Sequence, residues 1–389
     1  MHIAFDARVI QDHFPGIGRY AFNLLAALSN ELHNDETLTI LHDPSVANTR
    51  LPLARLQDKL KSPDMHWQEW LVPMFGTRVL LSRLPHTVRT VAHFPYYLRP
   101  IWPGCPSITT IFDTLFFVYP QVAPSARARI ANRMLNGLSV LTSQRVITAS
   151  HSAAQEMMRF LPASKHKTVV IPIAADPVFA PRDRRVQTDV IERLKLPPHF
   201  SLYLASNKPH KNLVRLVEAW GAVTSNGLLR ESTHTVTRYP APALVIAGHQ
   251  DPRYSDAQQR AKALGIEDHV RFIGAVTDDD AAALYSACDL FVFPSLYEGF
   301  GLTPLEAMAC GAPVACSNTT SLPEVAGDAA LLFDPTQPDS IAAICLKILR
   351  DEHLRMHLRE RSLAQASHFT WRDAARHTIS VYRDVARGL

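Results

Sequence analysis

The chain of 389 residues is poor in cysteine and lacks the cysteine spacings of disulfide frameworks and zinc sites. Its five cysteines are an odd number with no Cys-x-x-Cys pair, which favours reduced thiols in a cytoplasmic protein. No run approaches the roughly 18 apolar residues of a membrane-spanning helix, and the first residues lack a signal-peptide pattern. The 18 histidines are scattered and form no His-Glu-x-x-His motif. What remains is a globular protein, for which this length predicts two domains.

Positive charge is concentrated in the first half of the chain. Residues 1–185 contain 20 Lys and Arg against 13 Asp and Glu, whereas residues 186–389 contain 20 against 23. The stretch 76–145 mixes apolar residues with eight arginines and one acid, which predicts peripheral binding to an anionic membrane surface. The alternative is that the arginines only solvate helix faces. The eight are Arg78, Arg83, Arg89, Arg99, Arg127, Arg129, Arg133 and Arg145.

Strand-like and helix-like runs alternate along the chain, which is typical of α/β proteins with parallel sheets and crossover helices. Helices are expected from Arg19 to Leu32, at 125–140 and at 151–161, with Ser150 or Ser152 as the cap of the last. The expected strands lie at 2–5, 37–41, 89–92, 107–112, 144–149, 168–172, 201–205, 243–247, 270–273, 289–293, 313–316 and 330–333. The proline-rich stretch 172–198 contains the expected linker, and the polar stretch 224–242 is expected to be an exposed loop.

A glycine turn follows the strand-like run 290–293 and leads into a helix-like run. Gly299 and Gly301 let the backbone come close to a ligand, and the N–H groups that open the following helix form an anion site. Glu298 stands before the turn and Glu306 lies eight residues later. Backbone donors for phosphate with carboxylates for sugar hydroxyls on either side predict a nucleotide-sugar site.

The run EGFGLTPLEAMACGAPV, followed by SLPEVAGDAALLFDP, resembles the donor site of family 4 retaining glycosyltransferases. The resemblance implies the GT-B fold, in which two Rossmann-like α/β domains face each other across a cleft. It implies that Glu306 bonds the ribose hydroxyls and that Glu298, with a catalytic role, bonds the sugar hydroxyls. The backbone of Gly299, Phe300, Gly301 and Leu302 is expected to hold the sugar and the phosphates. The alternative to a donor site is that the glycines only make a turn and that Glu306 is a solvated helix residue.

The same resemblance divides the chain into three parts. Residues 1–180 are expected to form the acceptor-binding domain and residues 181–368 the nucleotide-sugar-binding domain. The last part, 369–389, is expected to be a helix that crosses back onto the first domain. Its apolar face comprises Trp371, Ile379, Val381, Tyr382 and Val385.

A second motif, Ser206-Asn207-Lys208-Pro209-His210-Lys211-Asn212, follows the strand-like run 201–205. Lys211 matches the family's diphosphate-binding basic residue and is expected to be catalytic. Ser206 and Asn207 stand where many members carry another basic residue, so Lys208 is expected to substitute for it in donor binding. The alternative for Lys211 is a surface lysine at a helix start, a position that the helix dipole disfavours.

The first domain carries weaker signals. Gly16 and Gly18 resemble the family's first glycine loop, which implies closeness to the donor phosphates, although a tight turn would also explain them. Phe112 departs from the family pattern, because many members have a histidine there beside the transferred sugar. His93, at the end of the preceding strand-like run, is expected to take a catalytic part in its place, with a structural histidine as the alternative.

No metal site and no cofactor are expected. The acids Asp278, Asp279 and Asp280 open a helix-like run, where the helix dipole stabilises them. In this architecture the lysine and the helix N-termini neutralise the diphosphate, so no metal is needed.

The sequence therefore predicts a metal-independent retaining hexosyltransferase in the cytoplasm, with a saccharide or polyprenyl-linked acceptor and no nucleic-acid partner. The start, FDARVI followed by GIGRY, is similar to bacterial mannosyltransferases of polysaccharide assembly, which favours GDP-mannose over UDP-glucose. One alternative is a nucleotide-sugar epimerase or phosphorylase of the same architecture. The other is a catalytically silent glycosyltransferase-like partner subunit, which Phe112 keeps open.

Overall fold

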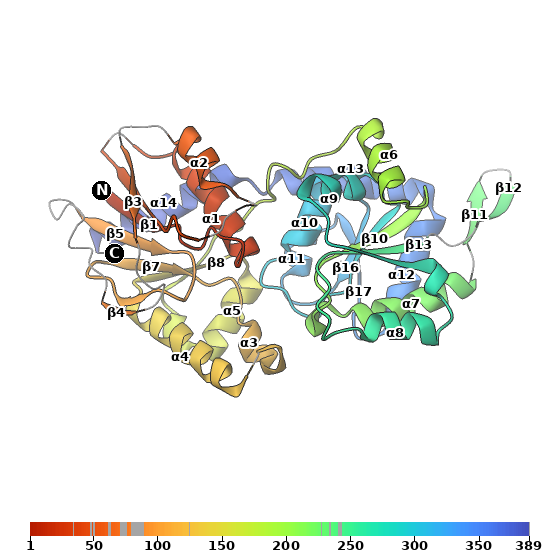
Figure 1. Ribbon diagram of the computed structural model, residues 1–389, viewed down its shortest axis with the longest axis horizontal. Coiled ribbons are helices and arrows are strands. Elements are labelled where there is room, and N and C mark those ends of the chain that lie inside the picture. Colours follow the sequence, from red (N-terminus) through yellow and green to blue (C-terminus); the bar gives the residue numbers. More distant parts are fainter. Residues whose placement is uncertain are drawn as a thin grey trace. The chain divides into compact units, whose positions relative to one another are not determined.

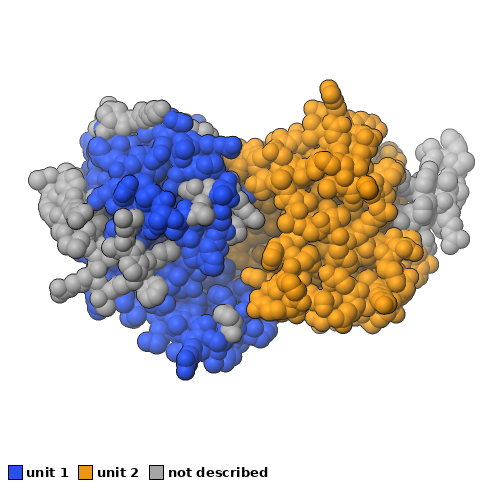
Figure 2. Space-filling view, viewed as in Figure 1, with its two compact units in different colours: residues 1–173, 370–389 blue, residues 174–369 orange. Residues whose placement is uncertain are grey.

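The computed structural model describes residues 1–33, 35–46, 49, 51–60, 64–70, 76–78, 89–123, 125–226, 228–232, 235–239 and 243–388. The chain forms two compact units (Figures 1 and 2). Unit 1 comprises Met1–Ile173 and Thr370–Leu389, and unit 2 comprises Ala174–Phe369. Each unit contains its own parallel sheet with helices packed against it, so the α/β class is confirmed.

Unit 1 is built on seven parallel strands in the order β3-β2-β1-β5-β7-β8-β9. The strands are β1 (His2–Asp6), β2 (Thr37–His42), β3 (Met65–Glu69), β5 (Thr90–Phe94), β7 (Ser107–Thr110), β8 (Arg145–Thr148) and β9 (Thr168–Val170). The helices are α1 (Pro15–Leu28), α2 (Leu53–Lys59), α3 (Leu115–Val118), α4 (Ala126–Thr142), α5 (His151–Phe160) and α14 (Trp371–Arg387). Ser150 caps α5, since its hydroxyl accepts a 3.0 Å bond from the Ala153 amide, as predicted.

Unit 2 is built on six parallel strands in the order β14-β13-β10-β15-β16-β17. These are β10 (Phe200–Leu204), β13 (Ala243–Ala247), β14 (Val270–Gly274), β15 (Leu290–Phe293), β16 (Val314–Ser317) and β17 (Ala330–Phe333). The helices are α6 (Arg184–Arg193), α7 (Leu213–Asn226), α8 (Asp256–Ala263), α9 (Asp278–Ala287), α10 (Leu302–Ala309), α11 (Leu322–Ala326), α12 (Pro338–Arg350) and α13 (Glu352–Ser367). The central strands are buried apolar runs, because helices cover both faces of the sheet.

Every predicted strand is present, and five strands among the described residues were not predicted, the first of them β3 at the edge of the sheet of unit 1. In unit 1, β4 (Gly76–Arg78) pairs with β6 (Pro100–Trp102). The stretch 224–242 was expected to be a loop, and this is wrong, because β11 (Leu228–Ser232) and β12 (Thr235–Tyr239) form an antiparallel hairpin there. The segment contains four threonines, a valine and a tyrosine, whose β-propensity was overlooked beside its other polar residues.

The boundary between the units lies at residues 173 and 174, earlier than the predicted 180 and 181. The reason is that residues before position 180 already pack into the core of unit 2. Phe179 is buried in the core of unit 2, with its ring 6.0 Å from that of Tyr285, and Ala175 and Val178 pack against the same core. The chain thus enters the second core before the proline-rich stretch ends.

The C-terminal helix α14 belongs to unit 1, as predicted. Its apolar face is buried, including Ile379 and Tyr382, and it packs along α1 and β5. Ion pairs flank this face: Arg383 binds buried Glu36 with two bonds of 2.8 Å, and Glu31 accepts bonds from two further arginines of α14.

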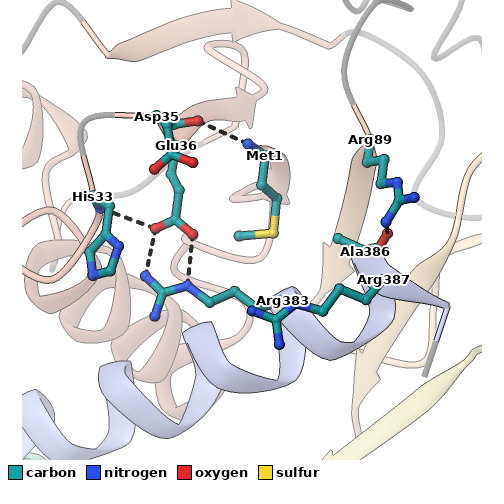
Figure 3. A pocket seen from close by; sticks show the side chains of 8 residues that line it. All are labelled: Met1, His33, Asp35, Glu36, Arg89, Arg383, Ala386 and Arg387. Carbon is teal, nitrogen blue, oxygen red and sulfur yellow. Dashed lines mark hydrogen bonds and ion pairs between the residues drawn. The ribbon is translucent and has the colours of Figure 1, made fainter.

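Figure 3 shows the Arg383–Glu36 pair in a pocket of about 430 Å³ at the end of α14. On the other side of this pocket, Arg89 donates a 3.1 Å bond to the Ala386 carbonyl and so binds the end of the helix. Burial alone would raise the pKa of Glu36, but hydrogen bonds from Arg383 and the His33 amide hold this pKa below its usual value. The stabilising effect of the carboxylate is therefore present above the ordinary carboxyl pKa and is lost as the pH falls through the lowered pKa.

We expect Arg383→Ala to lower the free energy of unfolding of unit 1 by about 2 kcal/mol, because it leaves the buried Glu36 carboxylate without its partner. This is less than for a fully buried pair, since the Arg383 side chain is partly exposed. Urea unfolding, with hydrogen exchange of the α14 amides, measures the loss. Arg372→Ala is the matched control, because Glu31 keeps Arg376. Equal losses in the two variants would contradict the special role of the Arg383 pair.

Candidate active site

The order of strands in unit 2 reverses between β10 and β15. From β10 the sheet continues through β13 to β14 on one side, and from β15 through β16 to β17 on the other. At such a point the loops that leave the carboxyl ends of the two strands diverge, and parallel α/β sheets bind their ligands there. The two loops are 205–212 and 294–301, which carry the two predicted motifs.

Lys211 and Glu298 meet at this point. The Lys211 Nζ lies 2.6 Å from Glu298 Oε1, and both side chains are 16% exposed. The ammonium also lies 5.2 Å from the centre of the Phe293 ring, at the end of β15. An ammonium has three N–H donors, and Glu298 uses one of them. A positive charge and a carboxylate thus stand side by side at the edge of the sheet, within reach of solvent.

Backbone hydrogen bonds hold the two loops together. The Leu296 amide donates to the His210 carbonyl at 2.8 Å, and the Ser295 hydroxyl donates to the same carbonyl at 3.3 Å. Asn212 adopts a left-handed conformation with φ 61°, which asparagine tolerates better than most residues. Its side-chain amide donates to the carbonyls of Pro294 and Pro335, at 3.0 and 2.7 Å. The conformation of Asn212 therefore orients the preceding Lys211.

Two hydroxyl residues that the sequence reasoning missed fix the backbone of Glu298. The Thr320 hydroxyl accepts from the Glu298 amide at 3.2 Å, and the Ser321 hydroxyl donates to the Glu298 carbonyl at 3.0 Å. Thr320 itself has a positive φ of 54°. The signal that could have found them is the hydroxyl-rich segment Thr319-Thr320-Ser321, whose last residue opens the quoted second half of the motif.

The glycine turn has the geometry that its sequence predicts. Gly301 has φ 107° and precedes α10, and a Cβ on it would lie 3.0 Å from Leu322 Cδ2. Only glycine adopts this conformation without strain. Leu302 then begins α10, and Phe300 is buried with its ring 5.8 Å from that of Phe369. Glu306 lies further along α10 and is 8% exposed, so its carboxylate is less accessible than that of Glu298.

The polar residues of the loop after β10 differ in burial and in their hydrogen-bond partners. Asn207 is buried, its amide donates to the carbonyls of Asp251 and Tyr254 at 2.9 and 2.7 Å, and its oxygen accepts from the Asp251 amide at 2.8 Å. Its side chain therefore supports the neighbouring loop. Lys208 is exposed and lines a small pocket of about 170 Å³, and Ser206 is half-buried with its carbonyl bonded to Tyr203.

Comparison with known proteins places this geometry in a family. The family model for glycosyl transferases group 1 matches residues 187–365. Over 395 residues, or 98% of this chain and 100% of the relative, the chain is 30% identical to the O-antigen chain mannosyltransferase B of Escherichia coli. The chain belongs to the group 1 glycosyltransferases.

Two solved structures have the same fold as this glycosyltransferase. Sucrose-phosphate synthase from Thermosynechococcus elongatus has a TM-score of 0.71 and 21% identity, with 100% of both chains covered. Anabaena HepE, in complex with UDP and glucose, has a TM-score of 0.70 and 18% identity, with 99% of this chain and 100% of that chain covered. The family and these likenesses confirm the predicted GT-B fold.

The two glycines of the first glycine loop, Gly16 and Gly18, have different surroundings. A Cβ on Gly18 would lie 2.9 Å from the Val9 carbonyl oxygen, so this glycine is required by the packing of its own loop. Gly16 is exposed, and a Cβ there would meet nothing within 4 Å. The structural alternative thus accounts for Gly18, whereas contact of Gly16 with the donor stays a prediction.

The structure favours the structural alternative for His93 over the predicted catalytic role. The ring is fully buried, with Nδ1 2.6 Å from the Tyr382 hydroxyl and Nε2 2.8 Å from the Thr110 hydroxyl. Burial lowers the pKa of His93 to about 3, so the ring is neutral at physiological pH. It serves to bind α14 to the sheet. Phe112, after β7, packs its ring 4.7 Å from that of Tyr20 and offers no group for proton transfer.

The acidic run at the start of α9 has partners within the protein. Asp279 pairs with Arg182 at 2.9 Å, Asp280 pairs with Arg193, and the Thr277 hydroxyl caps the helix by accepting from the Asp280 amide. These ion pairs and the N-cap account for the three acids as residues that stabilise the start of α9.

We expect Lys211→Ala to lower turnover of the nucleotide-sugar donor by about 100-fold or more, because it removes the charge that is predicted to face the donor's diphosphate. Lys208→Ala is the matched control from the same loop, and its exposed side chain predicts a much smaller loss. Steady-state kinetics measure both, with thermal unfolding to verify that each variant is folded. The reverse ranking would show that the diphosphate is held by Lys208.

Proposed function

We propose that this glycosyltransferase transfers mannose from GDP-mannose, with retention of configuration, to a saccharide or polyprenyl-linked saccharide in bacterial polysaccharide synthesis. The observation that carries the proposal is the pairing of Lys211 with Glu298 at the reversal point of a chain that aligns end to end with an O-antigen mannosyltransferase. UDP-glucose is the alternative donor. The structure of HepE, which has the same fold, contains UDP and glucose, and this supports the alternative.

In the proposed reaction, the bond between the anomeric carbon and the phosphate oxygen breaks, and its electron pair leaves with the diphosphate. The acceptor oxygen forms its bond to the anomeric carbon on the same face, and its proton passes to the leaving phosphate oxygen. Lys211 stabilises the charge that develops on that oxygen, while Glu298 holds sugar hydroxyls. Because the phosphate accepts the proton, this route does not need a histidine at position 112 or 93.

Metal independence belongs to the same proposal. The charge of the diphosphate would be balanced by Lys211 and by the N–H groups that open α10, after Gly301. An epimerase of this fold would bind a nucleotide sugar through the same residues, and a phosphorylase would exchange the sugar with inorganic phosphate. A silent partner subunit would bind the donor without turning it over.

A donor panel tests the proposal. We expect GDP-mannose to raise the apparent melting temperature more than UDP-glucose does, because a ligand that binds only the folded state stabilises it by mass action. With an oligomannoside acceptor we expect mannosyl transfer that EDTA does not change. Preference for UDP-glucose would overturn the donor assignment, and a clear loss with EDTA would overturn the metal-free mechanism. Conversion of the sugar without its release would indicate an epimerase, and binding without any turnover a silent subunit.

The membrane part of the proposal rests on α4 rather than on the whole arginine-rich stretch. Residues 79–88, which include Arg83, lie outside the described residues. Arg89 binds the end of α14, and Arg99 is buried among Ser107, Ser139 and Thr142, where burial lowers its pKa to about 10. These two arginines are therefore structural. Among the helices that the structure describes, none is long and apolar enough to cross a membrane.

Helix α4 exposes several apolar side chains and buries several polar ones, although it also buries Val140. It buries Asn132, Asn136 and Ser139, whereas Ile130, Met134 and Leu141 are 61%, 61% and 59% exposed. The helix contains no acid, and its three arginines are exposed at 127, 129 and 133. Exposed apolar side chains flanked by arginines suit the interface of an anionic lipid layer. The cytoplasmic leaflet attracts each nearby arginine by about 1 kcal/mol.

We expect salt-sensitive binding to phosphatidylglycerol vesicles and none to neutral phosphatidylcholine vesicles, measured by sedimentation. Replacing Arg127, Arg129 and Arg133 together with Gln should abolish binding to the anionic vesicles. The matched control replaces Arg184 and Arg185 with Gln, since these are exposed on α6 of unit 2. Equal binding to both kinds of vesicle, or to neither, would leave α4 as ordinary surface.

A further inference from the structure

A third loop borders the glutamate of the candidate active site. It joins β16 to α11 and contains Thr319, Thr320 and Ser321. Strand β16 is the neighbour of β15 in the parallel sheet of unit 2, so this loop leaves the same carboxyl edge, next to the loop of Glu298. Three hydroxyl side chains in a row thus stand beside a residue that we assign to the donor.

The backbone of Thr320 is strained. Among the residues that the structure describes, three that are not glycine have a positive φ: Lys195, Asn212 and Thr320. Asparagine tolerates this conformation, and Lys195 follows the cap residue of α6, where helices commonly end in it. Thr320 instead stands before a helix, and its φ of 54° is unfavourable for a side chain branched at Cβ. Backbone strain of this kind clusters at binding and active sites.

The hydroxyl of Thr320 keeps its own proton for a further partner. Its oxygen accepts a 3.2 Å bond from the Glu298 amide, and among the described residues no acceptor bonds its proton. Ser321 differs, because its buried hydroxyl already donates to the Glu298 carbonyl at 3.0 Å. A hydroxyl can accept and donate at once, and Thr320 is partly exposed. Thr320 can therefore donate a hydrogen bond to a ligand.

This proton lies close to the Glu298 carboxylate. The Thr320 hydroxyl bonds the amide of the same residue whose carboxylate pairs with Lys211 at 2.6 Å, so the two groups are no further apart than one residue allows. The hydroxyls of a pyranose stand on adjacent ring carbons, and each can donate and accept. An ionised carboxylate only accepts, whereas the threonine hydroxyl can donate. Together the two groups can bind two hydroxyls of one sugar in a defined orientation.

We propose that Thr320 is a specificity-determining residue of the donor site, whose hydroxyl donates a hydrogen bond to one hydroxyl of the transferred sugar while the Glu298 carboxylate accepts from another. The strained conformation of Thr320 holds the hydroxyl in this place. A site built to bond a sugar hydroxyl discriminates against a sugar that lacks it, because the protein group then loses its partner. The inference rests on the proposed transfer of a hexose from a nucleotide sugar.

The test compares GDP-mannose with its monodeoxy analogues, in titration calorimetry without an acceptor. We expect wild type to lose about fivefold in affinity when the hydroxyl that Thr320 contacts is removed from the sugar. Thr320→Val keeps the branched shape and should bind that analogue as well as it binds GDP-mannose, whereas Thr320→Ser should behave like wild type. Thr336→Val is the matched control, since the Thr336 hydroxyl lies in the loop after β17 and donates to Asp334.

Glu298→Gln separates contact with the sugar from mere positioning of the glutamate. If Thr320 bonds the sugar itself, Glu298→Gln stays sensitive to removal of the hydroxyl that Thr320 contacts. Insensitivity of Glu298→Gln and Thr320→Val to the same hydroxyl would show that Thr320 acts only through Glu298, and this would overturn the contact. A Thr320→Val variant that distinguishes every analogue as wild type does would overturn it as well.

Failure of the proposed donor gives a different result. A wild type that binds UDP-glucose in place of GDP-mannose would overturn the donor assignment, and the deoxy analogues of UDP-glucose then decide on Thr320 by the same comparison. A wild type that binds neither nucleotide sugar would overturn both the proposed function and the contact.

Discussion

Parallel pairing of strands is the constraint on which the rest of this molecule depends. A parallel sheet can grow in both directions from its centre only if the order of its strands reverses once, and each unit reverses at one pair, β1 with β5 and β10 with β15. At that pair the two outgoing loops must separate, and no helix can cover both carboxyl ends. The separation creates an edge where side chains from distant parts of the chain meet. Lys211 and Glu298, 87 residues apart, meet there in unit 2.

Rigidity at this edge comes from ordinary hydrogen bonds to the backbone. Asn212 bonds two carbonyls, and Thr320 and Ser321 hold the amide and carbonyl of Glu298. They decide where the charged side chains point, and a charge stabilises a transition state only when it is already in place. The loops at this edge thus contain two kinds of residue, those that we propose to act on the donor and those that hold them in position.

Unit 1 uses buried polar groups for a different purpose. His93, Thr110 and Tyr382 form a buried hydrogen-bonded chain, and Glu36 binds Arg383 at the edge of the same helix. Polar groups in a core are costly unless all are bonded, so they specify one position for α14 along the sheet. The histidine that could have served catalysis is thereby committed to structure, and Phe112 leaves no proton donor in the usual place. The proposed mechanism, in which the leaving phosphate accepts the proton, fits both facts.

Local sequence was sufficient for most strands of the two main sheets and for the donor motif. The strands are near-continuous apolar runs, Ser150 marks the start of α5, and Gly301 with Glu298 identified the turn, because each of these signals acts over a few residues. Tertiary structure decided the rest. His93 finds its partner 289 residues away, Phe179 joins a core that forms only when α9 folds against it, and the rings of Phe14 and Tyr96 meet only when two loops are adjacent. No local pattern encodes such contacts, since they exist only after strands far apart in the chain have paired.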